Sequence, residues 1–240
     1  MRIRVYQIEE SRDDRHVRLE SYPKTVALGG VDPSVYRCVF HGDIDGNSLD
    51  DVYTAFNQFD HSYLGTFQGH PVSISDVVEV TAEQPPGSHT PPGCYFCDCI
   101  GWRRLEFDSA LCAEMDGVRV LMLLPGKAPV VTHVIDDLPH WQTAVSFRGE
   151  DSLIEITSPF GDGVLTVSNE EAKLIGMEGN RRINGQIYAG PVFLVTDNGS
   201  GNFCGLTDDQ IAEYAERFRQ PEDISPEEVR KDIGLTFCTW

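Results

Sequence analysis

The chain opens with polar and apolar residues in alternation, the repeat of a strand that buries one face. Residues 2–8 follow this pattern, and residues 35–40, 76–81 and 94–107 are further apolar segments typical of strands. Helical spacing begins after Ser48, where apolar residues recur at positions 49, 52, 53 and 56. Serine is a favoured residue at the N-cap of a helix. The first half is therefore predicted to contain several strands and a helix that starts at Ser48.

Polar segments rich in proline and glycine separate these elements. Residues 11–34 contain two prolines and two glycines, and we interpret them as a loop-rich connection. Residues 82–93 contain four prolines and two glycines, and this segment is too long for a tight hairpin turn. We expect this second segment to be an exposed, mobile loop.

The second half alternates strands and helices again. The nearly continuous apolar run at 118–124 predicts a strand that is covered on both faces. Further strands are expected at 130–135, 153–157, 164–167, 187–196 and 235–240, and short helices at 138–147 and 169–176. Thr207 and Gln210 have the spacing of a capping box, and Ser225 with Glu228 repeats this signal. Two helices are therefore expected near the C-terminal end.

The irregular order of strands and helices, with short connections, favours an α+β fold over a doubly wound sheet. We expect two small mixed domains, each a mainly antiparallel sheet with one or two helices. The pattern changes near residues 108–117, which divides the chain into residues 1–112 and residues 113–240. The second domain would end in acidic helices and an acidic tail.

Several segments carry a resemblance to known domains. In the first half they are YRCVFHG (36–42), LDDVYTAFNQF (49–59), GHPVSISDVV (69–78) and YFCDCIGW (95–102). These resemble the YodL-like domain, a small module of Gram-positive mobile elements. In the second half they are NEEAKLIG (169–176), NRRING (180–185), Gly190 and LTDDQIAEYAERF (206–218). These resemble a domain of unknown function that phages and conjugative elements carry. The resemblance implies a mobile-element habitat, where small acidic proteins often disarm host defences, rather than a particular reaction.

The net charge excludes several classes of partner. The chain has 19 Lys and Arg residues against 38 Asp and Glu residues, a net charge of −19. Such a chain is not attracted to a nucleic-acid backbone or to an anionic membrane. The sequence begins without a secretory leader, and its seven cysteines are best explained as reduced thiols. We therefore expect a cytoplasmic protein without direct nucleic-acid or membrane partners.

The cysteine spacing raises the question of a zinc site. Cys94, Cys97 and Cys99 lie close together and Cys112 follows, with His70 or His89 as alternative fourth ligands. No second Cys-x-x-Cys pair occurs, and a strand would place Cys97 and Cys99 on the face opposite to Cys94. Buried thiols are therefore favoured, zinc stays an alternative, and no other cofactor is expected.

Paired arginines are the candidate for anion binding. Guanidinium groups match phosphate and carboxylate geometry, although in so acidic a chain they most simply bind the protein's own carboxylates. A serine and an aspartate just before a predicted strand could join them, or could satisfy backbone donors in the turn. The candidate residues are Arg181, Arg182, Asn180, Asn184, Ser73 and Asp76.

These patterns favour a non-enzymatic acidic protein that contacts a host protein. It would inhibit a host defence or nucleic-acid-binding system, with carboxylates in place of phosphates. The candidate partner-binding residues are Asp208, Asp209, Glu213, Glu216, Glu222, Asp223, Glu227 and Glu228. The alternative is a nucleotide- or small-anion-binding protein, or an enzyme, that uses Arg181 and Arg182. The oligomeric state stays open.

Overall fold

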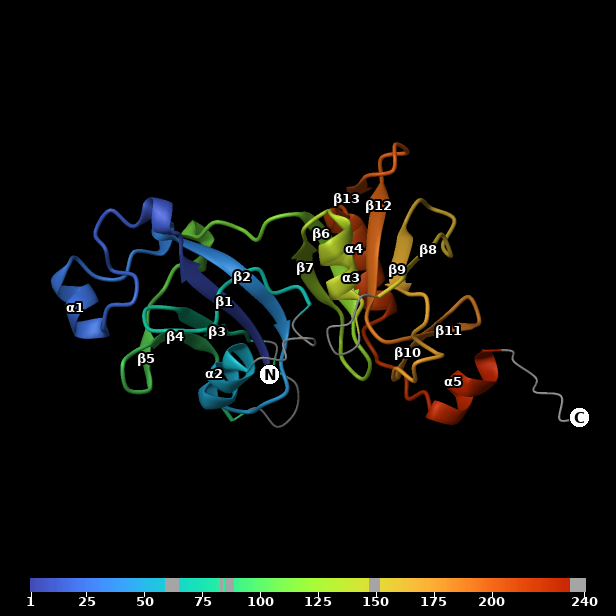
Figure 1. Ribbon diagram of the computed structural model, residues 1–240, viewed down its shortest axis with the longest axis horizontal. Coiled ribbons are helices and arrows are strands. Elements are labelled where there is room, and N and C mark those ends of the chain that lie inside the picture. The colour runs from blue at the N-terminus through green and yellow to red at the C-terminus, as the bar shows by residue number, and fades with distance from the viewer. Residues whose placement is uncertain (59–64, 83, 85–88, 147–151, 234–240) are drawn as a thin grey trace, which may run out of the picture. The chain divides into compact units, whose positions relative to one another are not determined.

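The computed structural model describes residues 1–58, 65–82, 84, 89–146 and 152–233, which divide into two compact units. The first unit consists of the described residues of Met1–His61 and Phe67–Asp116, and the second of those of Ser62–Thr66 and Gly117–Trp240. Within the described residues every pairing between named strands is antiparallel (Figure 1). The fold class is therefore α+β, as the sequence predicts.

The first unit is built on a five-stranded sheet with the strand order β2-β1-β3-β4-β5. Its strands are β1 (Arg2–Ile8), β2 (Tyr36–Asp43), β3 (Val77–Val80), β4 (Gly93–Cys97) and β5 (Trp102–Leu105), and its α-helices are α1 (Tyr22–Ala27) and α2 (Leu49–Asn57). Strand β1 pairs with both β2 and β3, which places the first strand of the chain inside the sheet.

Both faces of this sheet are covered. On one face Tyr6 and Phe96 belong to a buried cluster that also contains Met115. On the other face Phe40 of β2 contacts Phe56 of α2 edge to face, with ring centroids 5.1 Å apart. The sequence predicts that β1 buries one face, but the structure buries both. Successive strand residues point to opposite faces, and Val5 is as completely buried as its neighbour Tyr6.

The second unit has a larger sheet with the strand order β7-β6-β12-β9-β8, and β13 pairs with β12. Its strands are β6 (Val118–Leu123), β7 (Val130–Val134), β8 (Ile154–Thr157), β9 (Leu165–Asn169), β12 (Val192–Asp197) and β13 (Phe203–Cys204). A separate hairpin joins β10 (Gly179–Ile183) to β11 (Gln186–Ala189). The helices are α3 (Leu138–Ala144), α4 (Asp208–Arg217) and α5 (Pro226–Asp232).

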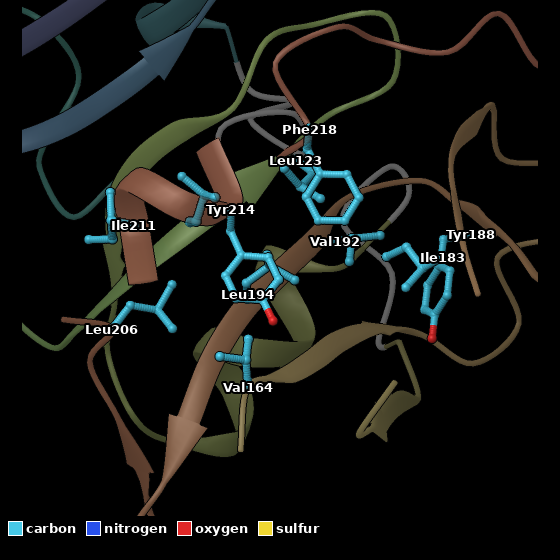
Figure 2. Packing of buried hydrophobic residues seen from close by; sticks show 11 residues of the cluster. Leu123, Val164, Ile183, Tyr188, Val192, Leu194, Leu206, Ile211, Tyr214 and Phe218 are labelled. Atoms are coloured by element: carbon cyan, nitrogen blue, oxygen red, sulfur yellow. The ribbon is translucent and has the colours of Figure 1, made fainter. Parts of the chain in front are cut away.

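Helices cover both faces of the larger sheet. Leu121 of β6 belongs to a cluster with Tyr214 of α4, whereas the neighbouring Val120 belongs to a cluster with Trp141 of α3. Figure 2 shows Tyr214 of α4 together with Leu194 of β12 in the first of these clusters. The apolar run of β6 is therefore explained by burial on both faces, as predicted.

The predicted helix starts are present. Ser48, Thr207 and Ser225 each occupy an N-cap, and each accepts a hydrogen bond from the backbone N–H three residues later. In all three helices the side chain at that third position reaches back to the N-cap backbone, which completes a capping box. These contacts fix where α2, α4 and α5 begin.

Other predictions need correction. Residues 94–107 do not form one strand, because a turn with Gly101 at φ +70° separates β4 from β5. Residues 169–176 form a strand end followed by turns rather than a helix. The connection 11–34 contains the short helix α1. The predicted strand at 235–240 lies outside the described residues, as do residues 83 and 85–88 of the proline-rich segment 82–93. Among the described helices, none combines the length and hydropathy needed to cross a bilayer.

Candidate functional site

The acidic surface formed by α4, α5 and the residues between them is partly neutralised by the unit itself. Five of the eight candidate carboxylates form ion pairs with basic residues of the second unit. The pairs are Asp208–Arg119 (2.6 Å), Glu222–Arg182 (2.8 Å), Glu228–Arg182 (2.7 Å), Glu227–Lys231 (2.9 Å) and Glu216–Arg219 (3.4 Å). Such exposed pairs contribute little to stability, but each reduces the charge offered to a partner.

The other three candidate carboxylates are not paired with a basic residue of the described chain. Asp209, Glu213 and Asp223 are exposed, and none of them forms an ion pair within the described part of the chain. Asp209 lies in the first turn of α4, where the helix dipole favours a negative charge. These three residues are the part of the predicted surface that a basic partner could contact without displacing an internal arginine.

Arg182 connects β10 to the start of α5. Its guanidinium contacts Glu222 and Glu228, and its backbone N–H donates to the Glu222 carboxylate at 2.9 Å. Hydrogen bonding to Glu222 raises the pKa of Arg182. Hydrogen bonds from Ser225, and then the charge of Arg182, lower the pKa of Glu228. An incoming anion would have to displace both carboxylates.

Arg181 points to the opposite side of β10 and is almost completely buried, with 1% of its surface exposed. Its guanidinium donates to the carbonyl oxygens of Lys127 (2.6 Å), Asn180 (2.9 Å) and Phe218 (3.4 Å). Burial lowers the pKa of Arg181. Phe218 is the C-cap of α4, so the cation lies at the negative end of that helix dipole. This arginine therefore joins three segments of the unit through their backbone.

The two asparagines of the predicted anion site also make internal contacts. The Asn180 side-chain amide donates to the carbonyl oxygens of Leu123 (2.8 Å) and Gly190 (2.6 Å). Asn184 has a φ of +49° in the β10–β11 turn, and its side chain donates to the carbonyl of Pro159. Both side chains therefore hold loops of the second unit in place.

Ser73 and Asp76 form a buried polar turn in the first unit. The Asp76 carboxylate accepts hydrogen bonds from the Ser73 backbone N–H and from Nε2 of Gln7, both at 2.9 Å. Asp76 is 1% exposed, and this burial raises its pKa to about 7. Ser75, with a φ of +76°, accepts from the backbone of Leu19 and from the Tyr36 hydroxyl. The turn therefore ties together β1, β2 and the connection that follows β1.

The six predicted anion-site residues are divided between the two units. Ser73 and Asp76 lie in the first unit, and the two arginines and two asparagines lie in the second. Neither unit by itself brings all six together.

The six described cysteines do not form a metal-binding cluster. Cys94 faces the cluster of Tyr6 and Phe96, near Cys112, while Cys97 points to the other face of β4 and Cys99 lies exposed in the following turn. Burial raises the pKa of Cys94 to about 11, and of Cys97 and Cys112 to about 12, so these thiols stay protonated at neutral pH. Among the described residues no group of three His, Cys, Asp or Glu side chains could hold a metal ion.

An exposed arginine that the sequence patterns did not indicate packs on aromatic rings. The Arg217 guanidinium carbon lies 4.9 Å from the Phe160 ring centroid and 5.5 Å from that of Phe218. Beside it, the Tyr214 hydroxyl donates to Asp162 at 2.7 Å. The spacing of positions 214, 217 and 218 on one helix face was the available signal. These contacts attach the loop between β8 and β9 to α4.

Two family matches cover most of the chain. Residues 2–107 match the YodL-like domain, and residues 118–219 match the domain of unknown function DUF3846. The chain carries a YodL-like domain followed by a DUF3846 domain. This is the order that the sequence resemblance implied. The DUF3846 match includes Arg181, Arg182 and α4, but it ends before α5. No curated protein and no solved structure matches the chain.

Proposed function

We propose that this chain is a non-enzymatic acidic binding protein of a mobile element. It acts in the host cytoplasm by contacting a basic host protein of a defence or nucleic-acid-binding system. The observation that supports this proposal most directly is the charge of −19. Residues 1–115 have 9 basic and 18 acidic residues and residues 116–240 have 10 and 20, so the two parts contribute −9 and −10. The acidity therefore belongs to both domains and is not an appended tail.

The contact would be electrostatic and would compete with nucleic acid. Uncompensated carboxylates attract a basic cleft over a distance of about 10 Å at 0.1 M salt, which accelerates association. Asp209, Glu213 and Asp223 are the carboxylates on the α4–α5 side that would make this contact without first breaking an ion pair. The family habitat, with its frequent inhibitors of host defence, supports the same direction by association.

The test is capture of host proteins on the immobilised full chain, followed by elution with duplex DNA. A partner that is bound by nucleic-acid mimicry should elute with DNA and should bind much less at about 1 M salt, where screening acts within about 3 Å. Elution by neither DNA nor salt would contradict the proposal.

A charge-matched pair of variants tests the surface. The first variant neutralises Asp209, Glu213 and Asp223 by substitution with Asn, Gln and Asn, and the same partner should then bind more weakly and with a smaller salt dependence. The control neutralises three exposed carboxylates of the first unit with the same change in net charge: Asp14→Asn, Asp50→Asn and Glu106→Gln. An equal loss of binding in both variants would rule out a contact at α4 and α5.

A further inference from the structure

Edge strands of a sheet expose unpaired backbone groups, and proteins usually cover them or place charges on them. In the first unit β2 is partly covered, because its backbone exchanges hydrogen bonds with Ala113. Strand β5, at the other edge, carries the exposed Arg103 and Arg104. Strand β8 is an edge of the second sheet (Figure 1). None of the described residues covers this edge, and the charged residue of the strand is Glu155.

The backbone of β8 is available for a further strand. Leu153 accepts a hydrogen bond from the backbone N–H of Glu170, which fixes the hydrogen-bonding register with β9. In an antiparallel ladder the bonded positions alternate, so Glu155 and Thr157 bond to β9, whereas Ile154 and Ile156 direct their N–H and C=O groups outward. These outward groups have no partner in the part of the chain that the structure describes.

The side chains along this edge are apolar and acidic. Leu153 and Ile156 are each 53% exposed, although the alternating faces of β8 place them on opposite sides of the sheet. Glu155, Glu170 and Glu171 lie at the same end of the β8–β9 pair and form no ion pair with the described residues. An added strand would cover both apolar side chains, and basic residues in it would meet carboxylates without internal partners.

We infer that the outer edge of β8 binds an extended basic segment of the partner, in which Lys or Arg alternates with β-branched residues. The partner strand would accept from and donate to Ile154 and Ile156, and its cationic side chains would face Glu155, Glu170 and Glu171. This inference rests on the proposed function, because the expectation that the partner is basic comes from that proposal. It differs from the α4–α5 surface in depending on backbone hydrogen bonds.

The test uses the full chain and a synthetic heptapeptide, acetyl-Lys-Val-Lys-Val-Arg-Ile-Lys-amide, with hydrogen exchange measured by NMR. Saturating peptide should slow exchange of the Ile154 and Ile156 amides by about tenfold or more, while Glu155 and Thr157 should change little because their amides already bond to β9. A peptide with Glu in place of every Lys and Arg should not protect these amides. Protection that is absent, or confined to other elements, would overturn the inference.

A proline substitution separates strand addition from simple charge attraction. Ile156→Pro removes an outward N–H and no bond to β9, so it should weaken the basic peptide about tenfold or more, and Ile156→Val should not. If Ile156→Pro fails to fold, Glu155→Lys replaces it and should weaken the basic peptide and favour the acidic one. Equal binding to all variants overturns the inference.

Two further outcomes identify the source of any result. If raising the concentration of the chain without peptide slows exchange of the Ile154 and Ile156 amides, a second copy of the chain occupies the edge. That result would overturn the assignment of the edge to a basic partner. The proposed function fails separately, when neither DNA nor salt elutes a captured partner, because the peptide experiment involves neither DNA nor a host protein.

Discussion

The buried carboxylate of Asp76 should make the first unit less stable as the pH rises. Its Coulombic neighbour Arg18 and the hydrogen bonds from Gln7 and Ser73 favour the charged form, but desolvation by burial is the largest influence. The pKa of Asp76 is therefore raised from 3.8 to about 7. The substitution Asp76→Asn keeps an acceptor oxygen for Gln7 and Ser73 and removes the titration.

The sign follows from comparing the folded and unfolded states of Asp76. Between pH 3.8 and about pH 7 the folded unit keeps a proton that the unfolded chain has released, so stability falls as the pH rises. Above about pH 7 both states are ionised and the dependence ends. A rise in pKa of this size corresponds to a loss of about 4 kcal/mol across the window. Asp98, whose pKa is lowered by Arg103, has the opposite effect, and only at lower pH.

The assay is native-state hydrogen exchange of the first-unit amides between pH 5 and pH 8, corrected for intrinsic exchange. Local exchange is needed because a chain with two units need not unfold in one step. The native chain should lose stability up to about pH 7, and Asp76→Asn should be nearly independent of pH, apart from a constant cost of about 1–3 kcal/mol for its new amide. Asp50→Asn, on the surface of α2, is the control. Flat behaviour of the native chain, or the same slope in Asp76→Asn, would refute the reasoning.

Three further predictions concern the second unit. Arg181→Met leaves buried carbonyl oxygens without their donor and should lower the unfolding free energy, measured in denaturant, by about 3 kcal/mol. Arg182→Met changes an exposed side chain and should cost under about 1 kcal/mol. Equal losses would contradict the role of Arg181 as a buried hydrogen-bond donor. Gly117→Ala would put a methyl group 2.2 Å from a β7 carbonyl oxygen at a φ of +95° and should cost about 3 kcal/mol of unfolding free energy, measured by thermal denaturation. In the same assay Gly126→Ala, at a φ of +65° in open space, should cost about 1 kcal/mol. The reverse order would be inconsistent with the described packing. Thr207→Ala removes an N-cap and should cost about 1 kcal/mol, measured by circular dichroism, and Thr207→Ser should restore most of it; no loss would mean that packing alone fixes the start of α4.

Local signals in the sequence were enough to predict much of the fold. The apolar run at 118–124 requires cover on both faces, and the capping boxes fix the starts of α4 and α5. The turn between β4 and β5 was not predicted because apolar residues lie on both sides of Asp98 and continue to Ile100, although Gly101 marks the turn. The expected helix at 169–176 failed because a segment of about two turns has little intrinsic stability, and helix formation there depends on tertiary packing.

The candidate site was less predictable. Arg181 and Arg182 are adjacent and looked alike, yet neighbouring strand residues point to opposite faces, so one is buried and the other meets carboxylates. The pairing of Arg182 with Glu222 and Glu228 spans 40 and 46 residues, and no local pattern specifies such a contact. The free edge of β8 also depends on the order of the strands in the sheet, and no local sequence pattern specifies that order.

The arrangement of the thiols gives the first unit a natural labelling position. Cys38, Cys94, Cys97 and Cys112 are buried or half-buried, and their burial raises the pKa of each thiol. Cys99 is the exposed thiol of this unit, in the turn between β4 and β5. Because alkylation proceeds through the thiolate, a maleimide dye or spin label should react first at Cys99 within this unit. A probe at that turn, paired with one introduced on α4, would report distances between the two domains without disturbing either hydrophobic core.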